Sequence, residues 1–139
     1  MKPLRVLIVD DEPLARTGLR DLVRQDPELE CVGECGDGLA AIAAIEALQP
    51  DLVLLDVQMP EIDGFGVIRA IGPARMPGVI FVTAYEEFAL AAFRVHALDY
   101  LVKPFTDRAL TESLDRAKRL VRDGQVQQLT DRLAELVGT

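Results

Sequence analysis

The chain has 139 residues, of which half are hydrophobic, and its 23 acidic and 15 basic side chains give a formal net charge of −8 at pH 7. This length suits one domain with a sizeable core, and the acidic balance without a basic stripe makes the chain a poor candidate to bind DNA by itself. No apolar run approaches the roughly 18 residues of a transmembrane helix, and the N-terminus has no signal-peptide pattern, so we expect a cytoplasmic protein without a membrane partner.

Short apolar segments predict the strands of a sheet. The uninterrupted apolar runs are residues 6–9, 52–55, 79–82 and 100–102. Such runs are typical of parallel strands that are buried on both faces, whereas the patchier residues 30–35 predict an edge strand. Apolar residues at helical spacing separate the segments, from a helix that begins near Pro13 to one that reaches Val121. Five strands alternating with five helices predict a doubly wound α/β fold with right-handed crossovers.

A polar signal stands at the end of each uninterrupted run. The signals are Asp10-Asp11-Glu12, Asp56, Thr83 and Lys103-Pro104, in chain order. Ligands of open α/β sheets bind beyond the carboxyl ends of the strands. Three carboxylates, a hydroxyl and an ammonium are therefore expected in one pocket at that edge.

These residue types suit a divalent cation and a phosphoryl group. Asp10, Asp11 and Asp56 would repel one another unless a proton or a cation joined them, and Mg²⁺ prefers oxygen ligands of this kind. Asp56 stands alone at its strand end, so we predict that it is the nucleophile that forms an aspartyl phosphate. Lys103 and the Thr83 hydroxyl would contact the phosphoryl group, with catalysis mostly a matter of positioning and charge neutralisation.

Each signal also has a simpler interpretation. The acidic triplet at 10–12 could cap the helix that begins near Pro13, Thr83 could be another helix cap, and Lys103 could be a solvated loop lysine. Cys31 and Cys35 are expected to be small apolar residues on one face of a strand rather than a metal site or a disulfide. His96 falls on the helical pattern of Phe88 and Ala92, where an isolated histidine is usually structural.

Four strings carry a resemblance to the receiver domain of two-component response regulators: VLIVDDEP, DLVLLDVQMPEIDG, FVTAY and DYLVKPF. The resemblance spans about residues 4–121, and it implies a flavodoxin-like sheet of strand order 2-1-3-4-5, which is one of the two common orders of doubly wound folds. It also implies that Asp56 accepts the phosphoryl group from a sensor histidine kinase. The domain is then a regulatory phosphoacceptor, and not an enzyme that turns over a substrate.

The resemblance assigns further roles by position. It implies that Asp11 and the backbone carbonyl of Gln58 ligate Mg²⁺ directly and that Asp10 acts through water. Thr83 and Tyr100 form the expected switch pair. The Lys103–Pro104 peptide bond is expected to be cis, a form that costs little before proline.

The string TAYEEFALAAFRVHALDYLVKPF resembles receivers that precede LytTR-type DNA-binding domains. We therefore expect a receiver at 1–122 and, at 123–139, a linker or C-terminal helix towards an absent output domain that alone would contact DNA. A stand-alone receiver or phosphorelay intermediate is the alternative. Residues 125–137 follow the spacing of a coiled-coil seam, so a homodimer is possible through this segment and the face of the fourth helix, fifth strand and fifth helix.

Two other functions fit parts of the pattern. A phosphatase of the haloacid-dehalogenase type also combines a strand-end aspartate, a lysine and Mg²⁺, but it needs D-x-D, which Asp56-Val57-Gln58 lacks. A flavodoxin-like cofactor binder would need a phosphate loop rich in Ser, Thr and Gly after the first strand. The acidic residues at 10–12 would repel a phosphate there in the absence of a metal.

Overall fold

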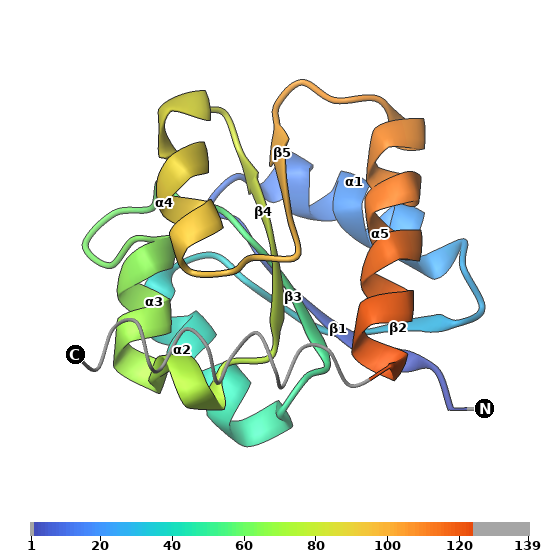
Figure 1. Cartoon of the computed structure of the whole chain (residues 1–139), viewed down its shortest axis with the longest axis horizontal. Helices are drawn as coiled ribbons and strands as arrows, with labels where there is room; N and C mark the ends of the chain where they lie inside the picture. The colour runs from blue at the N-terminus through green and yellow to red at the C-terminus, as the bar shows by residue number, and fades with distance from the viewer. Residues whose placement is uncertain (1, 124–139) are drawn as a thin grey trace.

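The expected strand segments pair into one parallel sheet in the computed structural model, which describes residues 2–123. The strands are β1 (Leu4–Val9), β2 (Leu29–Cys35), β3 (Leu52–Leu55), β4 (Gly78–Thr83) and β5 (Asp99–Val102). Their order across the sheet is β2-β1-β3-β4-β5 (Figure 1), which confirms the predicted order and the edge position of β2.

Helices cover both faces of this sheet (Figure 1). They are α1 (Pro13–Arg24), α2 (Gly38–Leu48), α3 (Gly64–Ile71), α4 (Ala89–Arg94) and α5 (Asp107–Arg122), with short 3₁₀ turns at Pro73–Arg75 and Glu86–Phe88. Buried residues of α1 and α5 pack on one face, and those of α2, α3 and α4 pack on the other. The doubly wound prediction is therefore confirmed.

The central strands contribute side chains to the cores on both faces of the sheet, because successive side chains of a strand point to opposite faces. On β3, Leu52 and Leu54 pack with α1 and α5, whereas Val53 and Leu55 pack with α2, α3 and α4. All four side chains are fully buried. This double burial explains why the run shows no polar alternation.

The prediction that Cys31 and Cys35 share one face of a strand is wrong. The register of β2 against β1 shifts between Cys31, which lies opposite Val6, and Gly33, which lies opposite Leu7. The extra residue, Val32, reverses the alternation of side chains beyond it. Cys31 consequently packs towards the α1 and α5 layer, and Cys35 packs in the opposite core.

The expectation of full burial also fails for the run at 100–102. Every residue of β5 is only half-buried, whereas β4 is buried along its whole length. The difference follows from position, since β5 is the outer neighbour of β4 and no strand within residues 2–123 pairs with its other side.

The fourth helix is shorter than the spacing predicts. It ends at Arg94, and His96 follows it with a positive φ of 55°. A left-handed residue cannot continue a right-handed helix, so His96 belongs to the turn that leads into β5.

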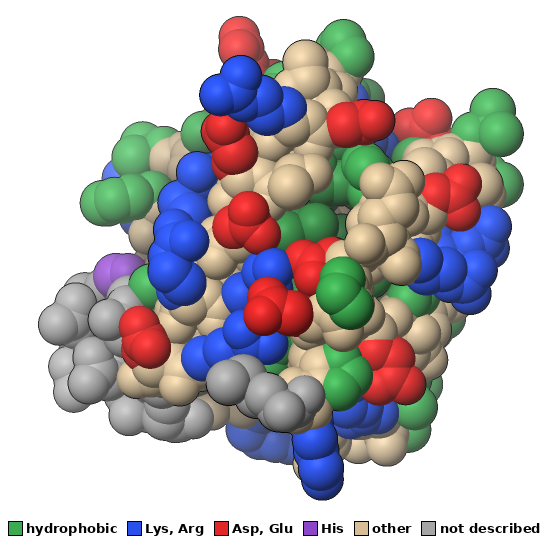
Figure 2. Space-filling model, turned by 90° about the vertical axis from the view of Figure 1, so that its right-hand side faces the viewer, with side chains coloured by type: hydrophobic (Ala, Val, Ile, Leu, Met, Phe, Trp, Pro, Cys, Tyr) green, Lys and Arg blue, Asp and Glu red, His purple; other side chains and the backbone are tan. Residues whose placement is uncertain are grey.

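Ion pairs tie the last turns of α5 to the loop between α1 and β2. The Lys118 ammonium lies 2.6 Å from Asp26, 2.8 Å from Glu28 and 3.1 Å from Asp115. Burial lowers the pKa of Lys118, but these carboxylates outweigh it and raise that pKa overall. Figure 2 shows basic and acidic side chains interspersed on the side of the molecule that carries α5.

Candidate functional site

The carboxyl ends of β1, β3, β4 and β5 meet at one edge of the sheet and bring the polar signals together. The Asp56 N–H donates to the Val9 carbonyl at 3.0 Å, which places Asp56 beside the residues that follow β1. The Lys103 N–H donates to the Thr83 carbonyl at 2.8 Å. Ladder geometry therefore sets all four strand ends side by side.

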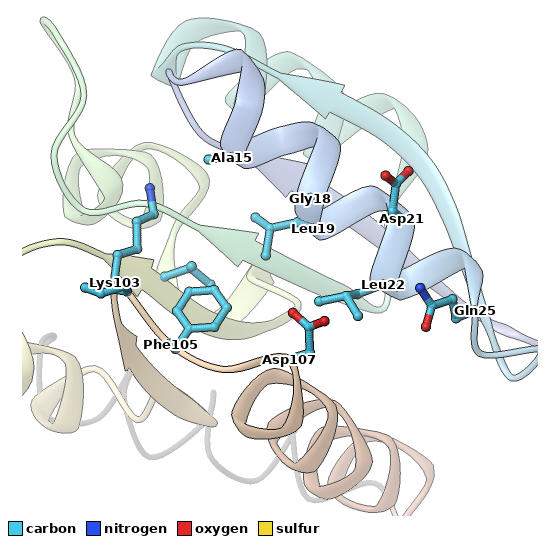
Figure 3. Close-up of a pocket in the computed structure, with 11 residues that line it drawn as sticks. Ala15, Gly18, Leu19, Asp21, Leu22, Gln25, Lys103, Phe105 and Asp107 are labelled. Carbon is cyan, nitrogen blue, oxygen red and sulfur yellow. The ribbon is translucent and has the colours of Figure 1, made fainter.

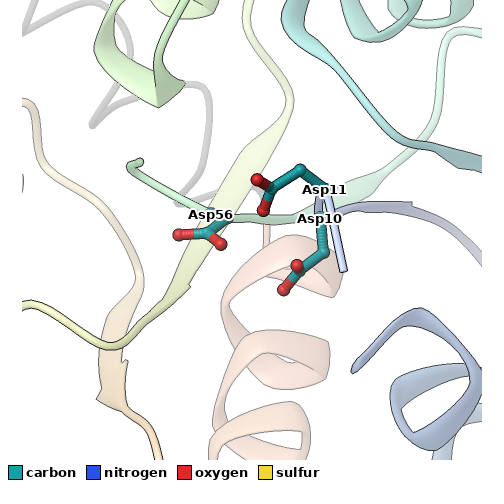
Figure 4. Close-up of side chains that lie close together, drawn as sticks. All are labelled: Asp10, Asp11 and Asp56. Atoms are coloured by element: carbon teal, nitrogen blue, oxygen red, sulfur yellow. The ribbon is translucent and has the colours of Figure 1, made fainter. Parts of the chain in front are cut away.

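Three carboxylates converge at this edge (Figure 4). Oxygens of Asp10, Asp11 and Asp56 lie within 4.8 Å of one another; Asp10 and Asp56 are buried, and Asp11 is exposed. The Asp10 side chain accepts from the Glu12 N–H at 2.9 Å. The Glu12 side chain makes no cap hydrogen bond to α1, so the acidic triplet acts on the cluster more than on the helix.

Lys103 balances part of this charge. Its ammonium lies 2.7 Å from Asp10, 3.5 Å from Asp56 and 3.5 Å from Glu12. Burial lowers the pKa of Lys103, but the hydrogen bond and charge of Asp10 outweigh it and raise that pKa. The interpretation as a solvated loop lysine is wrong. The peptide bond between Lys103 and Pro104 is cis.

Asp56 is buried, and the backbone of Gly64 lies close to it. Burial raises the pKa of Asp56 despite the charge of Lys103, and Asp10 raises it further. Its side chain accepts from the Gln58 N–H at 3.2 Å. Gly64, which the sequence marks only as part of a turn, lies so close that a Cβ there would be 2.5 Å from the Asp56 carbonyl oxygen.

Thr83 and Tyr100 are linked through Tyr85, whose part the sequence did not reveal. Thr83 is fully buried, and its hydroxyl oxygen accepts from the Tyr85 N–H at 3.4 Å. The Tyr100 hydroxyl donates to the Tyr85 carbonyl, and its ring packs on Phe81 with centroids 6.0 Å apart. Thr83 therefore does not cap a helix; it holds the loop that Tyr100 also holds.

The donor set fits a hard divalent cation. A cavity of about 360 Å³ opens beside the cluster, and its lining includes Asp11, Asp56 and Gln58. The ligands on offer are all oxygens, which Mg²⁺ prefers. Three carboxylates face a single ammonium within this cluster, so a cation would relieve the remaining negative charge.

Comparison with known proteins identifies the family. The model of the response regulator receiver domain matches residues 6–115. This chain belongs to that family. An uncharacterized response regulatory protein of Yersinia pestis is 48% identical over 116 residues, which cover 84% of this chain and 49% of that protein. The transcriptional regulatory protein BtsR of Escherichia coli is 42% identical over 116 residues, which cover 84% of this chain and 48% of BtsR.

Solved structures agree with this receiver domain. The response regulatory domain of MrkE from Klebsiella pneumoniae superposes with a TM-score of 0.79 at 29% identity, covering 86% of this chain and 99% of that domain. The signal receiver domain of the response regulator NarL from Mycobacterium tuberculosis superposes with a TM-score of 0.74 at 34% identity, covering 85% of this chain and 98% of that domain. The chain spans about half the length of the curated relatives it matches.

A larger cavity of about 490 Å³ lies between α1 and the loop that follows β5 (Figure 3). Leu19 and Leu22 of α1 form one wall and Phe105 the other, and Lys103 lines its edge. Leu14, near the start of α1, is 87% exposed. An apolar surface thus adjoins Lys103. None of the helices within residues 2–123 has the length and apolar character needed to cross a membrane.

Proposed function

We propose that Asp56 is the phosphoacceptor of this receiver domain and that its phosphorylation controls an output domain. The observation that carries the proposal is the buried Asp56 carboxylate, set among two further aspartates and 3.5 Å from the Lys103 ammonium. Nucleophile, charge balance and cation ligands are thereby gathered at one strand edge, as phosphoryl transfer to a carboxylate requires.

Each site residue has its own role in the proposed phosphoryl transfer. An Asp56 oxygen forms the new bond to phosphorus, while the bond from phosphorus to the donor's nitrogen or oxygen breaks and the electron pair leaves with the donor. Lys103 neutralises charge on the phosphoryl oxygens, and the Thr83 hydroxyl donates a hydrogen bond to one of them. Mg²⁺, held by Asp10, Asp11, Asp56 and the Gln58 carbonyl, would supply charge neutralisation on the opposite side.

The response would start at Thr83. Its hydroxyl accepts from the Tyr85 N–H, and Tyr100 donates to the carbonyl of the same residue. When Thr83 turns to the phosphoryl group it gives up that N–H, and the Tyr85 loop and Tyr100 are released together. The signal then reaches the surface of α4, β5 and α5, where Phe93 is 76% exposed. A switch from 1:99 to 99:1 needs only about 5.5 kcal/mol of differential binding.

We infer that the donor is a sensor histidine kinase that docks over α1. The apolar cavity between Leu19, Leu22 and Phe105 lies next to Lys103, so a partner helix placed there could bring its phosphohistidine to Asp56. An amphipathic helix that inserts apolar side chains into such a groove is a common mode of recognition. The alternative is a receiver without an output domain that exchanges its phosphoryl group with a phosphorelay protein, and such a partner could dock in the same cavity.

We propose that a LytTR-type DNA-binding output domain follows this receiver domain in the native protein. The support is the string at residues 83–105 and the greater length of relatives that bear transcriptional regulator names. The suggested helix at 125–137 lies outside the described residues. The described part ends just past α5, whose last residue is Arg122.

Phosphorylation with a small donor tests the acceptor. With acetyl phosphate and Mg²⁺, the intact mass should rise by one phosphoryl group in the wild type and in Asp21→Asn, an exposed aspartate on α1. Asp56→Asn should stay unmodified. Modification of Asp56→Asn at the wild-type rate would show that the acceptor lies elsewhere.

Sedimentation tests whether phosphorylation favours a homodimer through the face of α4, β5 and α5, on which Phe93 is exposed. The wild type and Phe93→Ala are compared with and without a beryllofluoride phosphoryl mimic, at concentrations on the order of tens of micromolar because dimerisation follows mass action. The mimic should raise the dimer fraction of the wild type more than that of Phe93→Ala. Equal monomer fractions in all four samples would exclude a phosphorylation-linked dimer through this face.

A further inference from the structure

Arg16 reaches from α1 back to the loop that carries the first two aspartates. It lies in the first turn of α1, where side chains lean towards the N-terminus of the helix. Its Nη1 donates to the backbone carbonyl of Asp10 at 2.6 Å. This contact joins a helix side chain to the peptide group between Asp10 and Asp11.

The guanidinium is also held from β2. Its Nε lies 3.9 Å from Glu34, and the other oxygen of Glu34 accepts from Arg20 at 3.0 Å. Gly36 lies against it as well, since a Cβ at that position would be 3.1 Å from the Arg16 Nη1. With a side chain only 23% exposed, Arg16 is confined between the strand and the loop.

The contact bears on Asp11 more than on Asp10. The Asp10 side chain has its own partners, the Glu12 N–H and the Lys103 ammonium. The Asp11 carboxylate has no hydrogen bond or ion pair among residues 2–123, so its place depends on the backbone. Because the peptide group is planar, holding the Asp10 carbonyl sets the direction in which Asp11 leaves it.

We propose that Arg16 is a positioning residue for the cation site: by holding the peptide group that joins Asp10 to Asp11, it keeps the Asp11 carboxylate turned towards Asp56. The inference rests on the proposed function, in which these carboxylates hold Mg²⁺. Groups that orient metal ligands without touching the metal commonly change metal affinity by about 10–100-fold when they are removed.

Charge and position make opposite predictions for the loss of Arg16. A guanidinium near the carboxylates repels a cation, so its removal would tighten cation binding if charge dominated. Glu34 already pairs with this charge, which weakens the repulsion. If Arg16 acts through position, its removal weakens binding because Asp11 is released. The sign of the change therefore separates the two effects.

The test measures Mn²⁺, which also takes oxygen ligands, by loss of the electron paramagnetic resonance signal of the free ion. Arg16→Gln is compared with Arg20→Gln, which removes a charge from the same helix and a partner from the same Glu34 but makes no contact with Asp10. The dissociation constant should rise about tenfold in Arg16→Gln and less than about twofold in Arg20→Gln. Equal constants, or tighter binding by Arg16→Gln, would overturn the inference.

Thermal unfolding without metal shows whether each variant is folded. If Arg16→Gln is not folded, Gly36→Val is tested in its place, because it changes no charge and puts a side chain where the guanidinium lies. The Mn²⁺ dissociation constant of Gly36→Val should exceed that of the wild type by about threefold or more. A dissociation constant equal to that of the wild type would overturn the inference. Absence of Mn²⁺ binding by the wild type would refute the proposed cation site itself, and with it this role of Arg16.

Discussion

Replacement of Asp56 by asparagine should stabilise the metal-free domain. Asp56 is 4% exposed, and its carboxylate oxygen lies within 4.8 Å of those of Asp10 and Asp11. At that distance each like-charged pair costs about 3.5 kcal/mol with an effective dielectric constant of about 20. Asparagine keeps the shape of the side chain and removes the charge that the fold must hold there.

Lys103 offsets most of this repulsion, and burial of the Asp56 carboxylate remains as the largest cost of its charge. Its ammonium, 3.5 Å from Asp56, contributes about 5 kcal/mol of attraction on the same scale. Since Asp11 is exposed and its share is screened, the charge interactions nearly cancel. Asparagine therefore relieves mainly the burial of the charge, for which we expect about 1–2 kcal/mol. For a domain of this size the midpoint of thermal unfolding should rise by about 5 °C.

The effect depends on pH with a definite sign. Burial raises the pKa of Asp56, so the folded wild type binds this proton more tightly than the unfolded chain. Its stability therefore falls as the pH rises from about 4 through the pKa of the folded state. The advantage of Asp56→Asn should be absent below about pH 4, grow across that interval and stay constant above it.

The assay is thermal unfolding at pH 7, with a chelator and then with Mg²⁺. Mg²⁺ at about 100 times its dissociation constant should add about 2.7 kcal/mol to the wild type and much less to Asp56→Asn, so the order of the two midpoints should reverse. Asp21→Asn, at an exposed site, should stay within about 0.5 kcal/mol of the wild type. A midpoint for Asp56→Asn at or below that of the wild type in chelator would refute the reasoning.

Gly64→Ala should lower the free energy of unfolding by about 1–3 kcal/mol, because its Cβ would lie 2.5 Å from the Asp56 carbonyl oxygen; urea unfolding that matches the wild type would contradict this. Gly18→Ala, inside α1 with open space around it, should instead stabilise by about 0.5–1 kcal/mol, and a loss of stability would contradict that. Lys118→Met should lower the free energy of unfolding by about 1–2 kcal/mol at pH 7, a loss between those typical of exposed and of buried ion pairs. Although burial raises the pKa of Asp26, Lys118 lowers it overall, so this loss should shrink as the pH falls below about 4; an equal loss at pH 7 and pH 3 would count against the ion pair.

The sequence alone determined the strands and the site residues that follow them. The runs at 52–55 and 79–82 are apolar throughout because both faces of β3 and β4 are covered, a requirement that leaves its mark on every residue. Asp56 and Thr83 could be located because each directly follows such a run. Parallel strands end at one edge, so the meeting of these residues followed from the order of elements along the chain.

Tertiary structure decided what depends on register and on contacts between distant segments. The extra residue Val32 puts Cys31 and Cys35 on opposite faces, and no local pattern marks it. Lys103 meets Asp10 across 93 positions of sequence. Such contacts depend on how helices and strands pack in space, and the periodicity of a segment records only which of its own faces is buried.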